Sequence, residues 1–247
     1  MDIQKMLSKM RKGVAAYKMI SDGDKIAVGV SGGKDSLLLL WLLAEYRRFS
    51  PERFELSAIS VDLCFDGVET DYTEIQAFCD KLNVPFYIER TQIGQVVFDV
   101  RKEKSPCALC SKMRKGALYD VAKKIGANKV ALGHHADDLI DTFILSLLYE
   151  GRLSTFAPKS YLDRTDLVLI RPMIFIEEMD VKPFTAVLPV KKSCCPANEN
   201  TKREYAKTLI SHIGTEVKNI REMIFTALIH PERYNLFDRF ESEIDKF

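Results

Sequence analysis

Short β-rich runs alternate with helical patterns along most of the chain, and this alternation constrains the fold more than any other feature. Unbroken apolar or β-branched runs occur at residues 25–30, 56–61, 85–88, 129–132 and 167–170. Such runs are typical of strands that are buried on both faces of a parallel sheet. Apolar residues at helical spacing lie between the runs, most clearly over residues 137–149. The pattern therefore predicts an α/β protein with a doubly wound parallel sheet and right-handed crossovers.

The helical patterns outside this alternation lie toward the two ends of the sequence. Apolar residues at helical spacing, interrupted by lysines and arginines, predict an N-terminal helix within residues 1–22. Residues 23–180 carry the alternation itself. Residues 181–247 turn helical, with breaks expected at Gly214 and Pro231. No linker is rich in Pro, Gly or Ser, so a single sheet domain with helical N- and C-terminal extensions is the simplest division.

The composition indicates a folded protein with reduced thiols. Of the 247 residues, 47% are apolar and 29% are charged, which permits a sizeable core and excludes a disordered chain. The longest apolar run is far shorter than the roughly 20 residues that span a bilayer, and no signal peptide is recognisable. We expect a cytoplasmic protein without a membrane partner. The even count of six cysteines does not require disulfides there, and the C-x-x-C formed by Cys107 and Cys110 predicts metal, cluster or redox chemistry.

A glycine pair follows the first predicted strand, in the segment Ser31-Gly32-Gly33-Lys34-Asp35-Ser36, and an apolar helix comes next. Glycines at a strand-to-helix junction let backbone N–H groups turn toward a ligand, and the helix N-terminus adds a partial positive charge. The segment is not a Walker A loop, because Asp35 follows Lys34, and it lacks the G-x-G-x-x-G dinucleotide fingerprint. A plain capped turn is the alternative. We predict a phosphate site of another type here.

Two of the cysteines, Cys107 and Cys110, form a C-x-x-C just before a predicted helix over residues 113–124. Cysteines three residues apart can present both sulfurs to one metal ion or cluster. Two buried thiols are the alternative, whereas a thioredoxin-like dithiol is disfavoured because the motif does not open the first helix of a βαβ unit. Cys64 and Cys79 lie in or near apolar runs, so we expect inert core thiols there.

Charge is distributed unevenly, although the net charge is only +1. Residues 101–115 carry six basic residues and one acidic residue, a local net charge of +5. Basic residues around thiols lower thiol pKa values and attract phosphate backbones, so this segment is a candidate nucleic-acid surface. We expect Lys123, Lys124 and Lys129 to be solvated instead.

Acidic residues gather after the fourth predicted strand, which runs into the block Gly133-His134-His135-Ala136-Asp137-Asp138. Carboxylates at a helix start interact favourably with the helix dipole. The two histidines belong either to a polar turn or to a metal ligand set. The sequence leaves both interpretations open, because no third ligand lies nearby.

Four blocks in this order resemble the tRNA 2-thiolation family of PP-loop ATP pyrophosphatases, most closely its tRNA 2-thiocytidine synthetase branch. They are the loop at 31–36, the C-x-x-C with Arg114-Lys115-Gly116-Ala117-Leu118, the block at 133–138, and Ile170-Arg171-Pro172. The likeness covers roughly residues 20–215. It implies an adenine nucleotide alpha hydrolase-like fold and an enzyme that cleaves ATP to AMP and pyrophosphate. The implied enzyme adenylates C2 of a pyrimidine in tRNA, with a cytidine in the anticodon loop as the favoured target, and inserts sulfur there.

The resemblance also implies site residues, cofactors and partners. A [4Fe-4S] cluster would be held by Cys107, Cys110 and Cys195, which with Asp138 would form the catalytic set. The phosphates of ATP would be held by Ser31, Gly32, Gly33, Lys34, Asp35 and Ser36. Gly133 and Asp138 match a second nucleotide block, where the carboxylate works through Mg²⁺; Lys115 would reach the phosphates and Asp62 would help to position the nucleotide. The partners would be tRNA and a sulfur donor, either a persulfide or another sulfide source.

Some details of the resemblance stay open. Relatives that thiolate uridine add zinc-binding cysteine pairs at both ends, which this sequence lacks, so the zinc-free branch is favoured. The third cluster cysteine stands in Cys194-Cys195-Pro196 rather than in a second C-x-x-C; we favour Cys195 and leave Cys194 as a spare thiol or sulfur carrier. Two alternative functions stay open: a PP-loop enzyme that moves sulfur on a small-molecule substrate, and a zinc-binding nucleic-acid adaptor. The apolar face of the first helix is a candidate homodimer surface.

Overall fold

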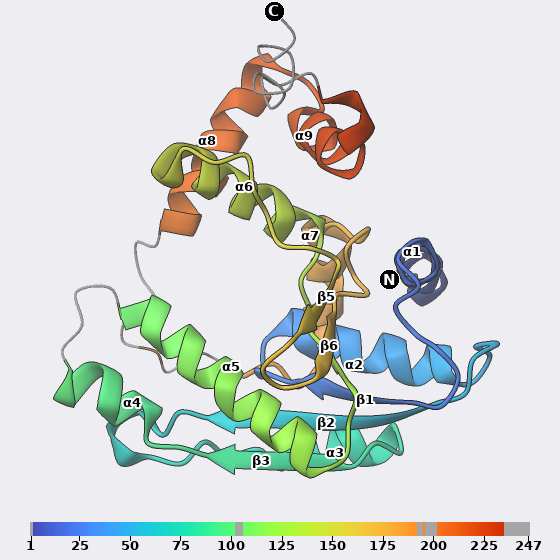
Figure 1. Cartoon of the computed structure of the whole chain (residues 1–247), viewed down its shortest axis with the longest axis vertical. Coiled ribbons are helices and arrows are strands. Elements are labelled where there is room, and N and C mark those ends of the chain that lie inside the picture. Colours follow the sequence, from blue (N-terminus) through green and yellow to red (C-terminus); the bar gives the residue numbers. More distant parts are fainter. Residues whose placement is uncertain (1, 102–105, 192–194, 196–201, 235–247) are drawn as a thin grey trace, which may run out of the picture.

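A six-stranded sheet forms the centre of the protein (Figure 1). The computed structural model describes residues 2–101, 106–191, 195 and 202–234. The order in the sheet is β3-β2-β1-β4-β6-β5, and every neighbouring pair is parallel except β5 with β6. The predicted α/β fold with a doubly wound, mostly parallel sheet is confirmed. The strands are β1 (Asp24–Gly29), β2 (Phe54–Asp62), β3 (Phe86–Arg90), β4 (Lys129–Ala131), β5 (Lys159–Leu162) and β6 (Leu167–Ile170).

All five predicted strands are present, and β5 is an additional strand at the edge of the sheet. β5 pairs antiparallel with β6, and its side chains alternate between exposed and half-buried. A strand with one face open to solvent has no continuous apolar run, which is the pattern that identifies the other five. The sequence pattern therefore missed β5.

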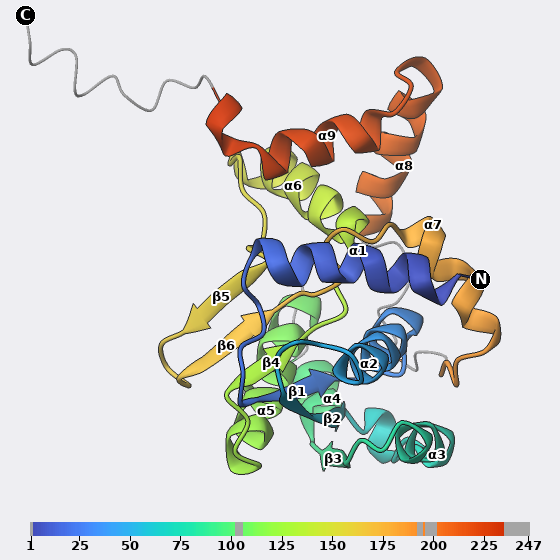
Figure 2. The ribbon, with the colours of Figure 1, turned by 90° about the vertical axis from the view of Figure 1, so that its right-hand side faces the viewer.

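Helices cover both faces of the sheet (Figure 2). α5 (Pro106–Lys124) covers one face, where Leu118 and Val121 pack against residues of β1, β2 and β4. α2 (Lys34–Arg47) and α3 (Thr73–Lys81) cover the other face. The leucines of α2 are fully buried, because α1 (Ile3–Ala16) and α7 (Glu178–Val181) pack on its outer side. The larger apolar core therefore lies on the α2 face.

The apolar face of α1 is buried within its own chain. Met6, Leu7 and Met10 are almost completely buried. A Cβ on Gly13 would lie 3.1 Å from the carbonyl oxygen of Pro172, so the helix lies close against the segment that follows β6. The expectation that this face is a homodimer surface is therefore wrong, because the face is already covered. Whether the protein forms a homodimer stays a prediction, and the apolar face of α1 is not available as its interface.

A further layer of helices stands apart from the sheet and carries the C-terminal part of the chain (Figure 1). α8 and α9 pack against α6 around a small apolar core. α8 runs through Gly214, so the expected break there is wrong, since one glycine costs a helix only about 1 kcal/mol. The chain turns at Asn219, which has a φ of +61°, and α9 ends before Pro231 as expected. The bounds are α6 (Ala136–Glu150), α8 (Lys202–Glu216) and α9 (Ile220–Ile229).

The remaining described helical segments are short. They are α4 (Ile93–Gln95), a π-helical turn at Val96–Val100, and 3₁₀ turns at Phe65–Gly67, Lys182–Ala186 and Pro231–Arg233. None of the described helices is long and apolar enough to cross a membrane.

Lys129, the first residue of β4, is buried rather than solvated. Its Nζ atom lies 2.6 Å from Asp24 Oδ2 and donates a hydrogen bond to the carbonyl oxygen of Met19 (2.9 Å). A buried cation is tolerated when a carboxylate and a carbonyl satisfy it in this way. The expectation for Lys129 was wrong because the residue belongs to the sheet and not to a helix face.

Candidate functional site

Two of the sequence blocks meet where the strand order of the sheet reverses. β1 pairs with β2 on one side and with β4 on the other. In open α/β sheets, ligands bind beyond the carboxyl ends of the strands at such a switch point. The loop at residues 31–36 follows β1, and the block at residues 133–138 follows β4. The fold thereby brings together two segments that lie far apart in the sequence.

The loop at residues 31–36 has a shape that suits an anion. Gly32 has a φ of +79°, a conformation that favours glycine. The Ser36 hydroxyl accepts a hydrogen bond from the Ser31 N–H (3.1 Å) and donates one to the Gly33 carbonyl (2.9 Å). α2 begins directly after Gly33, and the first N–H groups of a helix have no partner within the helix. These donors and the helix dipole make the loop a candidate phosphate site.

Gly133 brings the second block into backbone contact with the first. A Cβ on Gly133 would lie 2.8 Å from both the carbonyl carbon and the carbonyl oxygen of Asp35, and 2.9 Å from the nitrogen of Ser36. Real Cβ atoms do not approach backbone so closely, so only glycine permits this contact. The structure therefore explains on steric grounds why position 133 is a glycine. The predicted contact between Gly133 and a nucleotide stays a prediction.

The two carboxylates at the start of α6 pair with cations from the C-terminal helices. Asp138 Oδ1 lies 2.6 Å from the guanidinium of Arg203 on α8, and its Oδ2 accepts a hydrogen bond from the His135 N–H (3.0 Å). Asp137 Oδ1 lies 2.8 Å from Arg221 on α9. These partners are 65 and 84 residues away in the sequence, so no local pattern reveals them. Asp137 and Asp138 both lie in the first turn of α6, as the sequence predicted for carboxylates that interact with the helix dipole.

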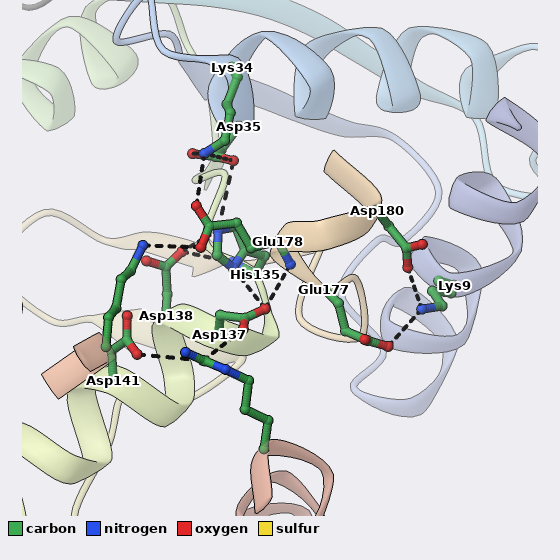
Figure 3. A network of polar contacts seen from close by, with 12 residues as sticks. Lys9, Lys34, Asp35, His135, Asp137, Asp138, Asp141, Glu177, Glu178 and Asp180 are labelled. Carbon is green, nitrogen blue, oxygen red and sulfur yellow. Dashed lines mark hydrogen bonds and ion pairs between the residues drawn. The ribbon is translucent and has the colours of Figure 1, made fainter. Parts of the chain in front are cut away.

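Glu178 on α7 connects the 31–36 loop to α8 (Figure 3). Sequence analysis missed this residue. Its two carboxylate oxygens lie 3.5 Å from Lys34 Nζ and 3.1 Å from Lys207 Nζ. Its N–H donates a hydrogen bond to Asp137 Oδ2 (2.7 Å). Burial acts to raise the pKa of Glu178, but the two lysine cations outweigh burial and lower that pKa to about 2. Glu178 is therefore a fixed negative charge between two parts of the candidate site.

Some buried acceptors in this region have no hydrogen-bond partner among the described residues. They are both carboxylate oxygens of Asp141, Oδ1 of Asp35 and Nδ1 of His135. Asp141 is fully buried, and burial raises its pKa to about 6. Its nearest ion-pair partner is Arg221, at 3.9 Å. Asp35 Oδ1 still lies 3.1 Å from the ammonium of Lys34, so the two oxygens of Asp141 are the clearest place where a donor or cation would be accommodated.

The surroundings of Asp35 test whether the residues fit a magnesium ion, since its Oδ1 makes no hydrogen bond among the described residues and lies 3.1 Å from the cation of Lys34. Mg²⁺ in nucleotide sites is held by one or two carboxylates together with phosphate oxygens and water. Asp35 lies in the first turn of α2, where a phosphate is expected, and His135 Nε2 lies 3.7 Å from Asp35 and 3.6 Å from Asp138. No group of three His, Cys, Asp or Glu side chains among the described residues is arranged to hold a metal ion. The carboxylates therefore fit Mg²⁺ only when phosphates complete its coordination.

His134 belongs to a polar turn and is committed to structural contacts. Its Nδ1 atom accepts a hydrogen bond from Arg171 Nε (3.1 Å), and its ring packs on Phe156 with centroids 4.9 Å apart. Burial lowers the pKa of His134 to about 4, so the ring is neutral at pH 7, as an acceptor at Nδ1 requires. The guanidinium of Arg171 also lies 4.6 Å from the Phe156 ring centroid and donates to the Ala157 carbonyl. The structure thus favours the polar-turn interpretation for His134.

The predicted cluster cysteines lie near one another. Cys107 and Cys110 are in the first turn of α5, which begins seven residues earlier than expected, so they lie inside this helix rather than before it. Burial raises the pKa of the Cys110 thiol, and the neighbouring thiols of Cys195 and Cys107 raise that pKa further. Cys107 is exposed, whereas Cys110 and Cys195 are half-buried. Cys194 lies outside the described residues.

The donor chemistry of this thiol group fits an iron–sulfur cluster. Cysteine sulfur is the ligand that such clusters use. The expected lowering of thiol pKa values by nearby basic residues does not hold for Cys110, because burial outweighs the effect of Arg114 and raises its pKa. The described thiols are not arranged as a finished metal site. They supply the ligand type and the proximity that a cluster held by three cysteines needs.

The predicted nucleotide contacts of Asp62 and Lys115 stay predictions, and the structure shows the surroundings of both residues. The carboxylate of Asp62 accepts hydrogen bonds from the N–H (2.8 Å) and hydroxyl (2.9 Å) of Thr70 and from the N–H of Cys64 (3.2 Å). Both of its oxygens therefore hold the loop after β2 in place. Lys115 is exposed on α5, and partial burial together with the nearby cation of Arg171 lowers its pKa.

The two remaining cysteines differ in their surroundings. Cys79 is fully buried on α3, and burial raises its pKa to about 12, so the predicted core thiol is confirmed. Cys64 is half-buried at a φ of +45° and lines a hollow of about 670 Å³ beyond the ends of β2 and β3. The expectation of a core thiol at Cys64 is wrong, because the chain leaves the sheet two residues earlier.

Comparison with known proteins identifies the family. A family model described as a PP-loop domain matches residues 3–210. The tRNA-cytidine(32) 2-sulfurtransferase of Syntrophotalea carbinolica is 37% identical over 232 residues, which cover 92% of this chain and 89% of that protein. The chain belongs to the tRNA 2-thiolation family of PP-loop proteins. A second family member, the tRNA-cytidine(32) 2-sulfurtransferase of Citrifermentans bemidjiense, is 32% identical over 237 residues, with 94% and 92% coverage. The predicted family resemblance is confirmed.

The fold of this family member also resembles solved structures. The U34-tRNA thiolase NcsA from Methanococcus maripaludis, described with its [4Fe-4S] cluster, superposes with a TM-score of 0.75 at 23% identity. The match covers 94% of this chain and 80% of that one. The NH3-dependent NAD synthetase of Campylobacter jejuni matches with a TM-score of 0.50 at 16% identity, over 96% of this chain and 99% of that one. These likenesses establish a shared fold, with the 31–36 loop at its switch point.

Proposed function

We propose that the chain is an ATP-dependent tRNA sulfurtransferase that replaces the C2 oxygen of a cytidine in the anticodon loop with sulfur. The observation that carries the proposal is the backbone contact between the 31–36 loop and the 133–138 block at the switch point. This contact occurs in a chain that is 37% identical to a tRNA-cytidine(32) 2-sulfurtransferase over most of its length. The geometry supports nucleotide binding, and the relatives support the choice of substrate.

The 31–36 loop would bind the phosphates of ATP. Its N–H groups and the hydroxyls of Ser31 and Ser36 are donors at the positive end of α2. Lys34 lies between Asp35 and Glu178, from which a more highly charged phosphate would draw it. Asp35 and Asp138 would hold Mg²⁺ jointly with the phosphates. Attack of the C2 oxygen on the α-phosphorus would then release pyrophosphate and leave AMP on the base.

Adenylation at C2 converts a poor leaving group into a good one, so sulfur can displace AMP. Cys107, Cys110 and Cys195 would hold a [4Fe-4S] cluster, as their chemistry and proximity permit. When bound, the cluster supplies an iron with an open position that carries sulfide. The basic residues Lys112 and Arg114 are exposed on the same helix as the first two cysteines and would meet the tRNA backbone.

The base must leave its stack to reach such a site, so the substrate would be a loop nucleotide. A persulfide or another sulfide source would be the sulfur donor. An enzyme with these partners works in the cytoplasm.

Reconstitution tests the proposal. The full chain is loaded anaerobically with iron and sulfide and incubated with unmodified tRNA, ATP and Mg²⁺; AMP, pyrophosphate and thiolated nucleosides are then measured. We expect 2-thiocytidine together with stoichiometric AMP. Cys107→Ala should lose the cluster absorbance and thiolation but keep ATP binding, whereas the control Cys64→Ala should keep all three. Asp138→Ala should lose adenylation and keep the cluster.

Several results would contradict the proposal. Thiolation that survives Cys107→Ala would refute the cluster assignment, and adenylation that survives Asp138→Ala would remove this residue from the site. Turnover only with small-molecule acceptors, with no salt-dependent tRNA binding, would support a small-molecule sulfur enzyme. Zinc without iron in the isolated protein would support a nucleic-acid adaptor.

A further inference from the structure

Direct contacts through Glu178 join the 31–36 loop to the C-terminal helices (Figure 3). The carboxylate of Glu178 accepts a hydrogen bond from Lys207 Nζ on α8 (3.1 Å) and a longer one from Lys34 Nζ in the loop (3.5 Å). All three side chains are mostly buried. Opposite charges interact more strongly where water is partly excluded. One carboxylate is therefore shared between two lysines that belong to different parts of the candidate site.

Glu178 is held beside the loop by contacts of its own helix. Its N–H donates a hydrogen bond to Asp137 Oδ2 (2.7 Å) at the start of α6. The neighbouring carboxylates of Glu177 and Asp180 lie 3.0 Å and 2.6 Å from the ammonium of Lys9, which ties α7 to α1 (Figure 3). The Glu178 carboxylate therefore stays beside the loop whether or not a lysine neutralises it.

Of its two lysine partners, Lys207 interacts more strongly with Glu178. Burial acts to raise the pKa of Glu178, but the ammonium of Lys207, and after it that of Lys34, lower this pKa to about 2. Glu178 is thus negatively charged at neutral pH, and Lys207 is the main group that neutralises it. Lys34 is joined to the same carboxylate only by the longer contact.

The binding of Mg²⁺-ATP would leave Glu178 in competition with the phosphates for Lys34. In the structure, Lys34 Nζ lies 3.1 Å from Asp35 Oδ1 and 3.5 Å from Glu178 Oε1. In the proposed function, Asp35 turns to Mg²⁺ and the phosphates draw Lys34. A Glu178 carboxylate neutralised by Lys207 competes weakly. Without Lys207, its full negative charge would both retain Lys34 and repel the phosphates.

We propose that Lys207 is a positioning residue that neutralises Glu178 and so leaves Lys34 free to bind the phosphates of ATP. The inference rests on the proposed function, because it uses ATP in the 31–36 loop. It gives α8 a part in nucleotide binding through a chain of described side-chain contacts, without any contact between Lys207 and the phosphates.

A double-mutant cycle tests the inference, with calorimetry of Mg²⁺-ATP binding to the full chain without a cluster. We expect Lys207→Gln to weaken binding about fivefold, at the lower end of common coupling free energies. Lys207→Arg keeps the charge and should bind within about twofold of the wild type. Glu178→Gln alone should also change the affinity by less than about twofold, because Lys207 already neutralises this carboxylate. In the Lys207→Gln background, however, Glu178→Gln should raise the affinity about fivefold.

Two matched controls come from the same helices. Lys202→Gln removes another lysine of α8, but Lys202 lies over the Tyr149 ring (4.3 Å), so the affinity should not change. Glu177→Gln removes another carboxylate of α7, but Glu177 pairs with Lys9, so this change should not rescue Lys207→Gln. Thermal melting confirms that each variant is folded.

Three results would overturn the inference. The first is wild-type affinity in Lys207→Gln. The second is an equal gain from Glu178→Gln in both backgrounds, which indicates a general effect of charge. The third is no gain from Glu178→Gln in the Lys207→Gln background, which indicates that Lys207 itself contacts the phosphates. A wild-type chain that does not bind ATP would instead refute the proposed function.

Discussion

Replacement of Asp141 with asparagine tests whether the network at the start of α6 contains a carboxylate that burial has left without a partner. Asp141 is fully buried, and neither of its oxygens has a hydrogen-bond partner among the described residues. The guanidinium of Arg221 lies 3.9 Å away, beyond hydrogen-bond reach. Burial raises the pKa of Asp141 from its ordinary value of 3.8 to about 6, against the opposing effect of the nearby cations.

The sign of the effect follows from which state holds the proton. Between pH 3.8 and about pH 6, the folded protein keeps the proton on Asp141 and the unfolded chain has lost it. The stability contributed by this group is therefore fully present below pH 3.8 and is lost as pH rises through 6. At 1.36 kcal/mol for each pH unit, the loss is roughly 3 kcal/mol. Asparagine cannot ionise, so a variant that carries it escapes this loss.

The assay is urea unfolding of the wild type and Asp141→Asn between pH 4 and pH 8. We expect the two proteins to differ little in free energy of unfolding near pH 4, and the variant to be more stable at pH 8 by roughly 2–3 kcal/mol. Asp120→Asn, which changes an exposed carboxylate on α5, should show no such trend. A difference between Asp141→Asn and the wild type that is the same at both ends of the range, or a destabilised variant at pH 8, would refute the reasoning.

Two further substitutions and one labelling experiment test separate parts of the account. Gly133→Ala places a Cβ 2.8 Å from the backbone of Asp35, so ATP affinity should fall by about tenfold or more; calorimetry that shows wild-type affinity would contradict the contact. Iodoacetamide should label Cys107 in the native protein and Cys79 only after unfolding, as peptide mass spectrometry can show, because Cys79 is buried with a pKa of about 12. Arg171→Met leaves buried acceptors without donors and should lower the free energy of unfolding in urea by about 2–4 kcal/mol; a loss below that range would mean that water replaces the guanidinium.

The sheet was predictable because its buried strands carry a local signal. β1, β2, β4 and β6 are largely buried, and the other edge strand, β3, still begins with the apolar run Phe86-Tyr87-Ile88, so all five runs are visible without any knowledge of the fold. β5 has no such run and is a strand because it pairs with β6. Its strand conformation therefore depends on contacts with residues outside its own segment. Helix ends were predicted less well for the same reason: α8 passes Gly214 because packing on α6 outweighs the preference of one residue.

The candidate site was predictable where its residues are consecutive and not where they are distant. The 31–36 loop and the 133–138 block are continuous segments, and a parallel sheet places both at the same edge. Arg203, Arg221 and Glu178 enter the site only because α7, α8 and α9 pack beside α6. Their charges look like ordinary surface charges in the sequence. Lys129 also looks like an ordinary surface charge in the sequence. It is buried because its ammonium pairs with Asp24 in β1, a contact that the sequence does not reveal.

The central claim is that this chain thiolates cytidine in tRNA, and the nucleosides of tRNA from cells that lack the chain test it most directly. Mass spectrometry of digested tRNA should show that 2-thiocytidine disappears when the gene is deleted. It should return when the wild-type chain is supplied, and not when Cys107→Ala is supplied. Unchanged 2-thiocytidine in the deletion strain, or the loss of a different thiolated nucleoside, would contradict the account.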